Sequence, residues 1–265
     1  MAQVGRIVKT AVITGGAGGL GRALSAKLLD RGWRIYLLDI DVSGVETTDR
    51  LYAIQVDLTK DDQLITASEK VLNVSPALDL VIYNAGVSHI AYFGEATDAA
   101  HRRLFEINYF SAVAMARAFQ SAVRAAKGTH LAISSVAGFT PLHRRTAYAA
   151  SKHAMQGFFT SLRSEESPYG VHTIIAAPSF VGTNLGADGK TADGMVRPGS
   201  ATDGLDYMMP DAAAEIIIRG VERRRSFIPV GRIARLAWLV NRLSPSLFEW
   251  LMRRNIAVGS ETKPE

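Results

Sequence analysis

Short apolar segments of strand length alternate along this chain with longer segments suited to helices, and this alternation restricts the fold more than any other feature. The strand-like segments cover residues 8–14, 33–39, 51–57, 78–83, 129–134, 172–177 and 226–230. The segments between them predict helices over about residues 20–30, 61–73, 97–126, 147–166 and 211–225. Strands that alternate with helices build a parallel sheet, because a parallel connection needs a crossover. The chain is therefore predicted to be an α/β protein, with helices on both faces of a parallel sheet.

Length and composition favour one domain with an appended tail. The 265 residues are 48% hydrophobic, which is enough for a full core, and no internal repeat or interdomain linker is recognisable. We expect residues 1–231 to form the domain, and residues 232–265 to add an amphipathic helical extension of it that ends in a disordered tail.

The charge is unevenly spread and excludes several classes of protein. Residues 219–254 hold nine arginines against two glutamates, a net charge of +7, whereas the whole chain carries +5. Because the rest of the chain is slightly acidic, a protein-wide nucleic-acid surface is not expected. The chain has no cysteine and its six histidines lack metal-ligand spacing, so we expect no metal site. We find neither a signal-peptide pattern nor an 18-residue uncharged apolar run, and we expect a cytoplasmic protein.

A glycine-rich turn follows the first predicted strand and opens the first predicted helix. It has the sequence Thr-Gly-Gly-Ala-Gly-Gly-Leu-Gly over residues 14–21. Glycines allow a tight turn and the close approach of a pyrophosphate, whose negative charge a helix N-terminus stabilises. Its place after the first strand indicates a dinucleotide site in a doubly wound sheet of the Rossmann type. The residues expected to hold the dinucleotide here are Gly15, Ala17, Gly18, Gly19, Leu20 and Gly21.

Asp39 ends the second predicted strand, 18 residues after Gly21. A carboxylate at this point can accept hydrogen bonds from both ribose hydroxyls of adenosine, and it repels a 2′-phosphate. No basic residue directly follows it, since Ile40 and Asp41 come next, although Arg22 and Arg34 are near in the sequence. The pattern favours NAD over NADP, with Asp39 and Ile40 at the adenosine end.

Tyr148 and Lys152 lie four residues apart on a predicted helix and therefore share one face. A phenol has an ordinary pKa near 10, and a fixed ammonium beside it favours the phenolate. Lowering that pKa by about 3 units takes roughly 4 kcal/mol, which the ammonium and a positively charged nicotinamide ring could supply together. The pair indicates a general acid and base for alcohol–ketone chemistry.

These motifs occur in an order that resembles the short-chain dehydrogenases/reductases. Residues 14–21 match the Thr-Gly-x-x-x-Gly-x-Gly pattern, residues 84–86 read Asn-Ala-Gly, and Ser135 precedes Tyr148 by 13 residues, with Lys152 following. The resemblance covers about residues 8–231 and implies an NAD(P)-binding catalytic domain there.

The resemblance also implies roles for individual residues. Ser135 and Tyr148 would contact the substrate oxygen, with Tyr148 transferring the proton and Lys152 lowering its pKa and holding the nicotinamide ribose. Asn108 would complete a proton relay through a water. Ser134 is the rival of Ser135, which the spacing favours. The remaining cofactor contacts implied by the family are Asp57, Leu58, Asn84, Ala85, Gly86, Pro178, Val181 and Thr183.

The loop after the sixth strand departs from the family pattern. Ser179 stands where the family usually has glycine after Pro178, and a positive φ there would place modest strain on a serine. Residues 184–209 are rich in glycine and predict a mobile lid over the substrate. The stretch 143–145, His-Arg-Arg, is expected in a solvated loop, with an anion-favouring pocket mouth as the alternative.

The C-terminal segment 232–254 allows three interpretations. Apolar residues recur at helical spacing, and most of the polar residues lie away from them. The apolar positions are Ile233, Leu236, Ala237, Val240 and Leu243. The stripe could pack on its own subunit or a partner, bind a membrane interface, or cover a substrate pocket. All three favour a hydrophobic substrate such as a lipid, steroid, terpene or aromatic alcohol.

The sequence as a whole predicts an NAD(P)-dependent enzyme that interconverts a secondary alcohol and a ketone. The alternative is a dinucleotide-sensing or membrane-recruited binding protein without turnover; the intact set of Asn108, Ser135, Tyr148 and Lys152 disfavours it. By resemblance, helices 97–126 and 147–166 would form the contact of a homodimer, or of a homotetramer with a second interface.

Overall fold

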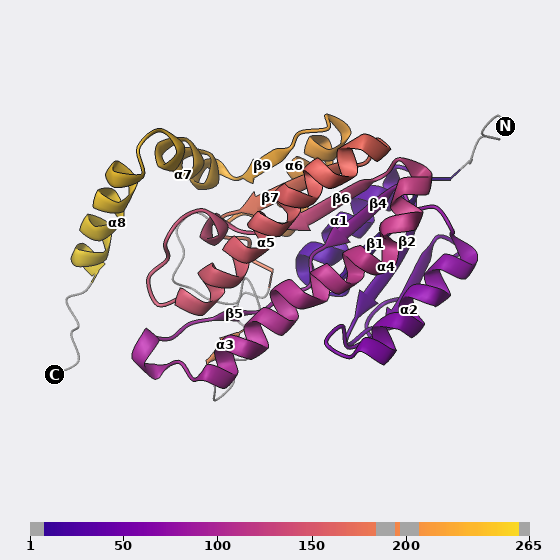
Figure 1. The fold of residues 1–265 in the computed structure, drawn as a ribbon, viewed down its shortest axis with the longest axis horizontal. Helices are drawn as coiled ribbons and strands as arrows, with labels where there is room; N and C mark the ends of the chain where they lie inside the picture. The colour runs from indigo at the N-terminus through magenta and orange to yellow at the C-terminus, as the bar shows by residue number, and fades with distance from the viewer. Residues whose placement is uncertain (1–7, 184–193, 197–206, 260–265) are drawn as a thin grey trace.

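The computed structural model describes residues 8–183, 194–196 and 207–259, and within this part a seven-stranded sheet forms the centre of the molecule (Figure 1). Its strands are β1 (Thr10–Thr14), β2 (Arg34–Asp39), β3 (Leu51–Gln55), β4 (Leu80–Tyr83), β6 (Thr129–Ile133), β7 (His172–Pro178) and β9 (Phe227–Val230). All pair in parallel, in the order β3-β2-β1-β4-β6-β7-β9. The order reverses direction between β1 and β4, which is where ligands bind in sheets of this type.

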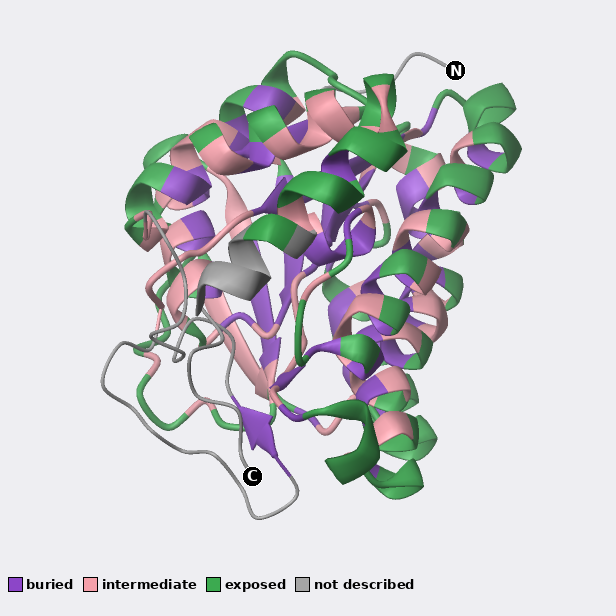
Figure 2. Ribbon diagram, turned by 90° about the vertical axis from the view of Figure 1, so that its left-hand side faces the viewer, coloured by how far each residue is buried: buried purple, intermediate pink, exposed green. Residues whose placement is uncertain are grey.

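Helices cover both faces of the sheet, as the alternation of segments predicts. The helices are α1 (Gly19–Asp30), α2 (Asp61–Val74), α3 (Asp98–Phe105), α4 (Ser111–Ala126), α5 (Thr146–Glu166), α6 (Pro210–Glu222), α7 (Arg232–Leu243) and α8 (Pro245–Gly259). One core cluster joins the sheet to α2, α4 and α5, and a second joins its other face to α1 and α6. The strands lie buried between the helices, whose outer surfaces are exposed (Figure 2). The predicted doubly wound α/β fold is confirmed.

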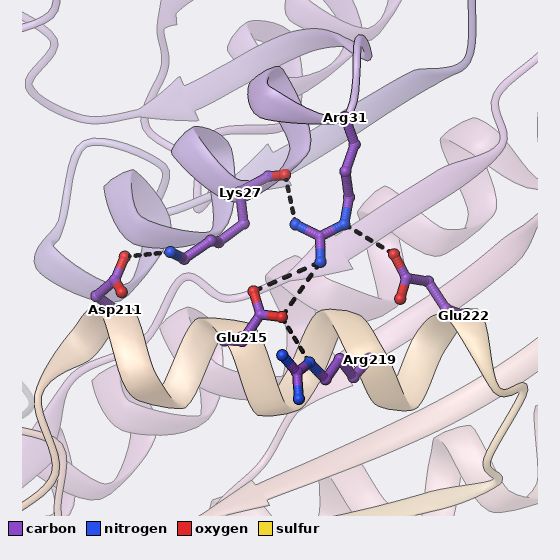
Figure 3. Close-up of polar contacts among 6 residues, drawn as sticks. All are labelled: Lys27, Arg31, Asp211, Glu215, Arg219 and Glu222. Carbon is purple, nitrogen blue, oxygen red and sulfur yellow. Dashed lines mark hydrogen bonds and ion pairs between the residues drawn. The ribbon is translucent and has the colours of Figure 1, made fainter.

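A row of ion pairs fastens α6 to α1 (Figure 3). Lys27 Nζ lies 2.8 Å from Asp211, and Arg31 reaches Glu222 at 2.7 Å and Glu215 at 3.4 Å. Beneath these exposed pairs, Leu24 and Leu28 of α1 belong to the same core cluster as Ala213 and Ile217 of α6. Exposed ion pairs contribute little free energy each, so the apolar contacts stabilise the seam and the charges set its alignment.

The long helix predicted over residues 97–126 is interrupted. The turn Glu106–Phe110 is a π-helix between α3 and α4, and it contains Asn108. Such a turn inserts one residue into the helix, and a sequence without proline or glycine gives no sign of it. The interruption turns Asn108 into the core, where its side chain has no exposed surface.

Short elements complete the described structure between the main strands and helices. An antiparallel pair joins β5 (Ser88–His89) to β8 (Met195–Val196), which the sequence analysis does not predict. Short helical turns lie at Phe93–Glu95, Val136–Gly138 and Ser167–Tyr169. Most of the predicted lid, residues 184–193 and 197–206, lies outside the described residues, as does the end of the predicted tail.

The two C-terminal helices pack differently from the predicted stripe. Leu236 and Leu243 are exposed, whereas Asn241, expected on the polar side, donates a hydrogen bond of 2.8 Å to the carbonyl of Phe139. Trp238 stacks on Phe227, with ring centroids 5.7 Å apart. The helix therefore packs on its own subunit through the indole, the amide and the partly buried Ile233, Ala237 and Val240, while part of the predicted stripe stays exposed.

In the described part of the chain, no helix is both long and apolar enough to cross a bilayer. In the same part, no group of three or more histidine or acidic side chains is placed to hold a metal ion.

Candidate active site

A cavity of about 1040 Å³ opens at the carboxyl ends of the parallel strands. The predicted residues that line it are Gly15, Ala17, Gly18, Gly19, Leu20, Asp39, Ile40, Asp57, Leu58, Asn84, Ala85, Gly86, Ser135, Tyr148, Lys152, Pro178, Val181 and Thr183. Gly21 and Asn108 do not line it, because Gly21 packs against the backbone of Gly15 and Asn108 lies one layer deeper. The fold therefore brings together residues that the sequence separates by up to 168 positions.

The glycine-rich turn needs glycine at two places for different reasons. Gly15 has a φ of 61°, in the left-handed region, and an added Cβ would lie 2.7 Å from Ala85 Cα. Gly19 has ordinary backbone angles, but a Cβ there would lie 2.8 Å from the Cβ of Thr183. The two glycines thus let the loops after β4 and β7 approach the start of α1.

Hydrogen bonds fix the end of β1 to the end of β4. The backbone amides of Asn84 and Ala85 both donate to Thr14 Oγ1 at 3.1 Å, and Asn84 Nδ2 donates to the carbonyl of Gly15 at 2.8 Å. The asparagine that the family resemblance assigns to the cofactor site thus also locks the glycine-rich turn in place.

The start of α1 suits an anionic group. Gly18 precedes the helix without a side-chain cap, and its first turn contains no acidic residue. The first amides of a helix have no partner within it, and they carry a partial positive charge. This cradle beside two glycines fits the pyrophosphate of a dinucleotide, with Asn84, Ala85 and Gly86 along its side.

Two opposite charges, those of Asp39 and Arg22, line the cavity beside the glycine-rich turn. Asp39 Oδ2 accepts a hydrogen bond of 2.9 Å from the amide of Ala17. Arg22, which also lines the cavity, donates to the carbonyls of Ala17 at 2.7 Å and of Gly44 at 2.8 Å. Asp39 lies at the end of β2, as expected from the sequence. The sequence showed that Arg22 is near, but not that its guanidinium lines the same cavity.

Ser135 and Tyr148 meet through a hydrogen bond between their side chains. Ser135 follows β6 and caps the next helical turn, where its Oγ accepts from the amide of Ala137 at 3.1 Å. Burial raises the pKa of the Tyr148 hydroxyl above 10, and the Ser135 hydrogen bond and the charge of Arg145 lower it by less. The direction is opposite to the lowered pKa expected from the sequence, because burial of the phenol outweighs the nearby positive charge.

Lys152 is buried on the same face of α5. Its Nζ donates to the carbonyl of Ile133 at 3.0 Å and lies 5.9 Å from the centre of the Tyr148 ring. Burial lowers the pKa of Lys152 from 10.5 to about 8. The ammonium is therefore largely protonated at pH 7; it also donates to Met155 Sδ at 3.9 Å, which leaves a further proton for a ligand.

Asn108 uses its side chain to hold the strand end beside the cavity. Its Oδ1 accepts from the amide of Val87 at 2.8 Å, and its Nδ2 donates to the Val87 carbonyl and to Ser151 Oγ, both at 3.0 Å. A Cβ added to Gly86 would lie 3.1 Å from Asn108 Oδ1 and 3.6 Å from Lys152 Nζ. Both protons of the Asn108 side-chain amide donate within the protein. The water of a proton relay would therefore have to bind to an oxygen atom of Asn108.

Two further predictions concern serines. Ser134 faces α5, where it accepts from Gln156 Nε2 at 3.3 Å, while Ser135 faces Tyr148; this arrangement agrees with the spacing argument.

Among the described residues, the non-glycine positions with positive φ are Lys127, Arg144 and Arg224. Ser179 is not one of them, so the backbone strain considered for it is absent.

Arg145 is the residue that the sequence analysis undervalued. Its two predecessors are exposed, but Arg145 itself is 9% exposed and lines the cavity next to Tyr148. Its position three residues before Tyr148, at the N-cap of α5, was the available signal. The cavity is also lined by residues outside the motifs, among them Ser88, Arg103, Glu106, Leu142, Phe180, Val196 and Tyr207.

Comparison with known proteins decides the family. A family model described as short chain dehydrogenase matches residues 9–193. The chain belongs to the short-chain dehydrogenase/reductase family. Dehydrogenase/reductase SDR family member 7B of Xenopus laevis is 30% identical over 257 residues, which cover 91% of this chain and 80% of that protein. A Drosophila melanogaster protein named dehydrogenase/reductase SDR family protein 7-like is 30% identical, with 93% and 80% covered.

Solved structures share the fold of this short-chain dehydrogenase. One from Burkholderia cenocepacia, in complex with NADP, has a TM-score of 0.78 at 22% identity, covering 97% of this chain and 98% of that one. One from Streptomyces avermitilis has a TM-score of 0.77 at 21% identity, covering 96% and 100%. Family membership makes this protein an oxidoreductase of the NAD(P)-binding Rossmann class, and the cradle at the start of α1 fits such a cofactor.

Proposed function

We propose that this short-chain dehydrogenase interconverts a secondary alcohol and a ketone, with Tyr148 as the general acid and base. The observation that carries the proposal is the hydrogen bond between Ser135 and Tyr148, in a cavity that Lys152 also lines. The cofactor, when bound, supplies or accepts a hydride at its nicotinamide ring, so the protein's part is to orient the substrate and move one proton.

The three side chains would divide the work. Ser135 orients the substrate oxygen and stabilises charge that develops on it. Tyr148, whose raised pKa keeps it neutral at pH 7, donates its proton to that oxygen in ketone reduction and removes it in the reverse direction. Lys152 places an ammonium behind the phenol and can hold a ribose hydroxyl of the cofactor.

Tyr148→Phe tests the proposal, because it removes the hydroxyl and keeps the ring. We expect turnover to fall at least about a hundredfold, as for loss of a general acid, while NADH affinity measured by nicotinamide fluorescence stays within about twofold. Tyr207→Phe, at another tyrosine of the cavity, is the matched control and should retain activity. Full turnover by the Tyr148 variant would refute the assigned role, and absence of turnover in the wild-type protein on every alcohol and ketone tested would favour a dinucleotide sensor.

We also propose that NAD is preferred over NADP. The support is the Asp39 carboxylate, which lies 2.9 Å from the amide of Ala17 and would face a 2′-phosphate. Asp39→Asn keeps an oxygen acceptor for Ala17 and removes the charge, so NADPH affinity should rise more than NADH affinity falls. Asp39→Ala should weaken NADH by roughly tenfold, since the ribose and Ala17 both lose an acceptor. Preference of the wild-type protein for NADPH would contradict the proposal and assign the phosphate to Arg22.

The proposed substrate is hydrophobic. Leu142, Phe180 and Val196 line the cavity away from the glycine-rich turn, and a large apolar ligand could fill the space beside them. A screen of secondary alcohols of increasing chain length, with NAD, tests this point. A fall in kcat/KM with increasing apolar size would contradict it.

The proposed assembly is a homodimer or homotetramer that uses α4 and α5. Phe110 at the start of this surface is 49% exposed beside Tyr109, and an added Cβ on Gly157 of α5 would meet no atom within 4 Å. Flat surfaces of small and aromatic residues suit helix packing between subunits. Light scattering of Phe110→Arg should show smaller particles than the wild-type protein.

A further inference from the structure

Helices α7 and α8 present large apolar side chains to solvent. They lie at one end of the molecule, with α8 extending beyond the sheet (Figure 1). The residues that form this C-terminal apolar face, with their exposed fractions, are Leu236 (63%), Leu239 (50%), Leu243 (77%), Leu247 (48%), Trp250 (51%) and Leu251 (39%). A soluble protein seldom exposes so many large apolar side chains together, and such a surface marks an interaction site.

The C-terminal apolar face is not needed to hold the helices in place. The opposite side of α7 packs on the domain through buried Ala234, the stacked Trp238 and the hydrogen bond from Asn241 to the Phe139 carbonyl. In α8 the side chain of Phe248 is buried, and this helix packs against α7. No described residue of either helix lines the cavity, so the face does not act as a cover over the substrate either.

Arginines border the apolar face. Leu236, Leu239 and Leu243 share one side of α7, because they lie three, four and seven residues apart. Arg235 and Arg242, also seven residues apart and exposed, run along one edge of that side. The segment 232–254 holds five arginines and one acidic residue, Glu249.

We propose that this face docks on a membrane surface with anionic headgroups. Leucine and tryptophan side chains would enter the boundary between headgroups and acyl chains, and the arginines beside them would meet the headgroups. A second copy of this chain is the weaker candidate, because symmetric pairing of the same face would bring like charges together. The attachment is independent of the reaction, since it uses no residue of the cavity.

The geometry also determines how the domain would sit. Asn241 binds the turn Val136–Gly138 at its exit, Phe139, and that turn begins directly after Ser135. Trp238 stacks on Phe227 at the start of β9. A docked α7 is therefore rigidly connected to the catalytic end of the sheet, rather than attached by a flexible tether.

Vesicle co-sedimentation of the full chain tests the proposal, with no cofactor or substrate. The vesicles are phosphatidylcholine alone, or phosphatidylcholine with on the order of 30% phosphatidylserine. We expect the wild-type protein to partition at least about tenfold better onto the anionic vesicles, and less so at high salt. Replacing all three leucines (Leu236→Gln, Leu239→Gln, Leu243→Gln) should lower binding at least about tenfold on both vesicle types. Arg235→Gln with Arg242→Gln should lower it by about twentyfold on anionic vesicles only.

Matched controls use the same substitutions elsewhere. Ile65→Gln with Val74→Gln removes exposed apolar side chains from α2, and Arg223→Gln with Arg225→Gln removes two exposed arginines outside the face. These variants should bind as the wild-type protein does, and circular dichroism should show equal melting temperatures throughout. A wild-type protein that stays in the supernatant, or a triple leucine variant that binds equally well, would overturn the proposal. Light scattering that shows a larger wild-type assembly, lost only in the triple variant, would assign the face to a second copy.

Discussion

Replacing the buried Lys152 by methionine is expected to stabilise the folded protein while abolishing its activity. Methionine has a similar length and no charge, so Lys152→Met removes the cost of holding an ammonium in the core. Lys152 is 4% exposed, and its Nζ donates to the Ile133 carbonyl at 3.0 Å and to Met155 Sδ at 3.9 Å. An active-site group that is kept at a cost to stability is typical of functional sites.

The magnitude follows from the pKa of Lys152. A folded-state pKa of about 8 against 10.5 for the exposed group corresponds to roughly 3 kcal/mol of unfavourable free energy at pH 7. Loss of the hydrogen bond to Ile133 destabilises the variant by about 1–2 kcal/mol, so the net effect should be a variant more stable than the wild-type protein by about 1–2 kcal/mol at pH 7. Between pH 8 and 10.5 the unfolded chain binds more protons than the folded one, so the stability of the wild-type protein rises with pH through this window. From pH 7 to 9.5 it should gain about 2 kcal/mol relative to the variant.

Urea unfolding followed by circular dichroism measures this difference. Wild type, Lys152→Met and the control Lys70→Met, at an exposed position of α2, are compared at pH 7 and 9.5. Subtracting the curves cancels every other titrating group that the proteins share. The reasoning would be refuted if the wild-type protein were more stable than Lys152→Met at pH 7. It would also be refuted if the difference in their free energies of unfolding were the same at pH 7 and 9.5.

Two further perturbations address the buried histidine and the glycine-rich turn. Burial lowers the pKa of His130 to about 4, and its Nδ1 lies 2.7 Å from the Tyr83 hydroxyl. The free energy of unfolding should therefore fall by roughly 2 kcal/mol between pH 7 and 5, because the histidine takes up a proton in the unfolded chain but not in the folded one. His130→Asn should lose most of this pH dependence in urea melts. Gly19→Ala should weaken NADH binding about tenfold or more in fluorescence titration, because its methyl group meets Thr183. The control is Gly18→Ala, whose Cβ would lie 3.5 Å from the nearest atom and which should bind NADH within about twofold of the wild-type affinity. Equal losses of affinity in the two variants would show that contact with Thr183 is irrelevant.

The sequence predicted the strands of the main sheet well because most of them are buried on both faces, although β3 at the edge is only partly buried. Within the predicted segment 8–14, the structure has Thr10–Thr14 as β1 with every residue buried. The segment pattern predicted a strand end just before Ser135 and a helix that carries Tyr148 and Lys152, and the structure has Ser135 just after β6 and the other two on α5. These are local properties, and a single chain shows them without reference to its partners in space.

What the sequence missed depends on contacts between distant residues. The pair β5 and β8 needs Ser88 to meet Val196, more than 100 residues away, and neither segment has a strand pattern of its own. The raised pKa of Tyr148 depends on how deeply the phenol is buried, which spacing on a helix does not specify. On α7 the sequence left open what the apolar stripe contacts, because helical periodicity identifies an apolar stripe but not the surface that it faces.

The ion-paired seam between α1 and α6 has a consequence for engineering. The chain between β7 and α6 is fixed near its start, where Thr183 touches Gly19 at the beginning of α1. The same connection is fixed after its end, because Lys27 and Arg31 of α1 form ion pairs with α6. Both anchors belong to α1, and between them β8 pairs with β5, so the connection is held at its start, at β8 and after its end. Segments from other dehydrogenases exchanged between these points should change substrate selectivity while the cradle at the start of α1 keeps its shape.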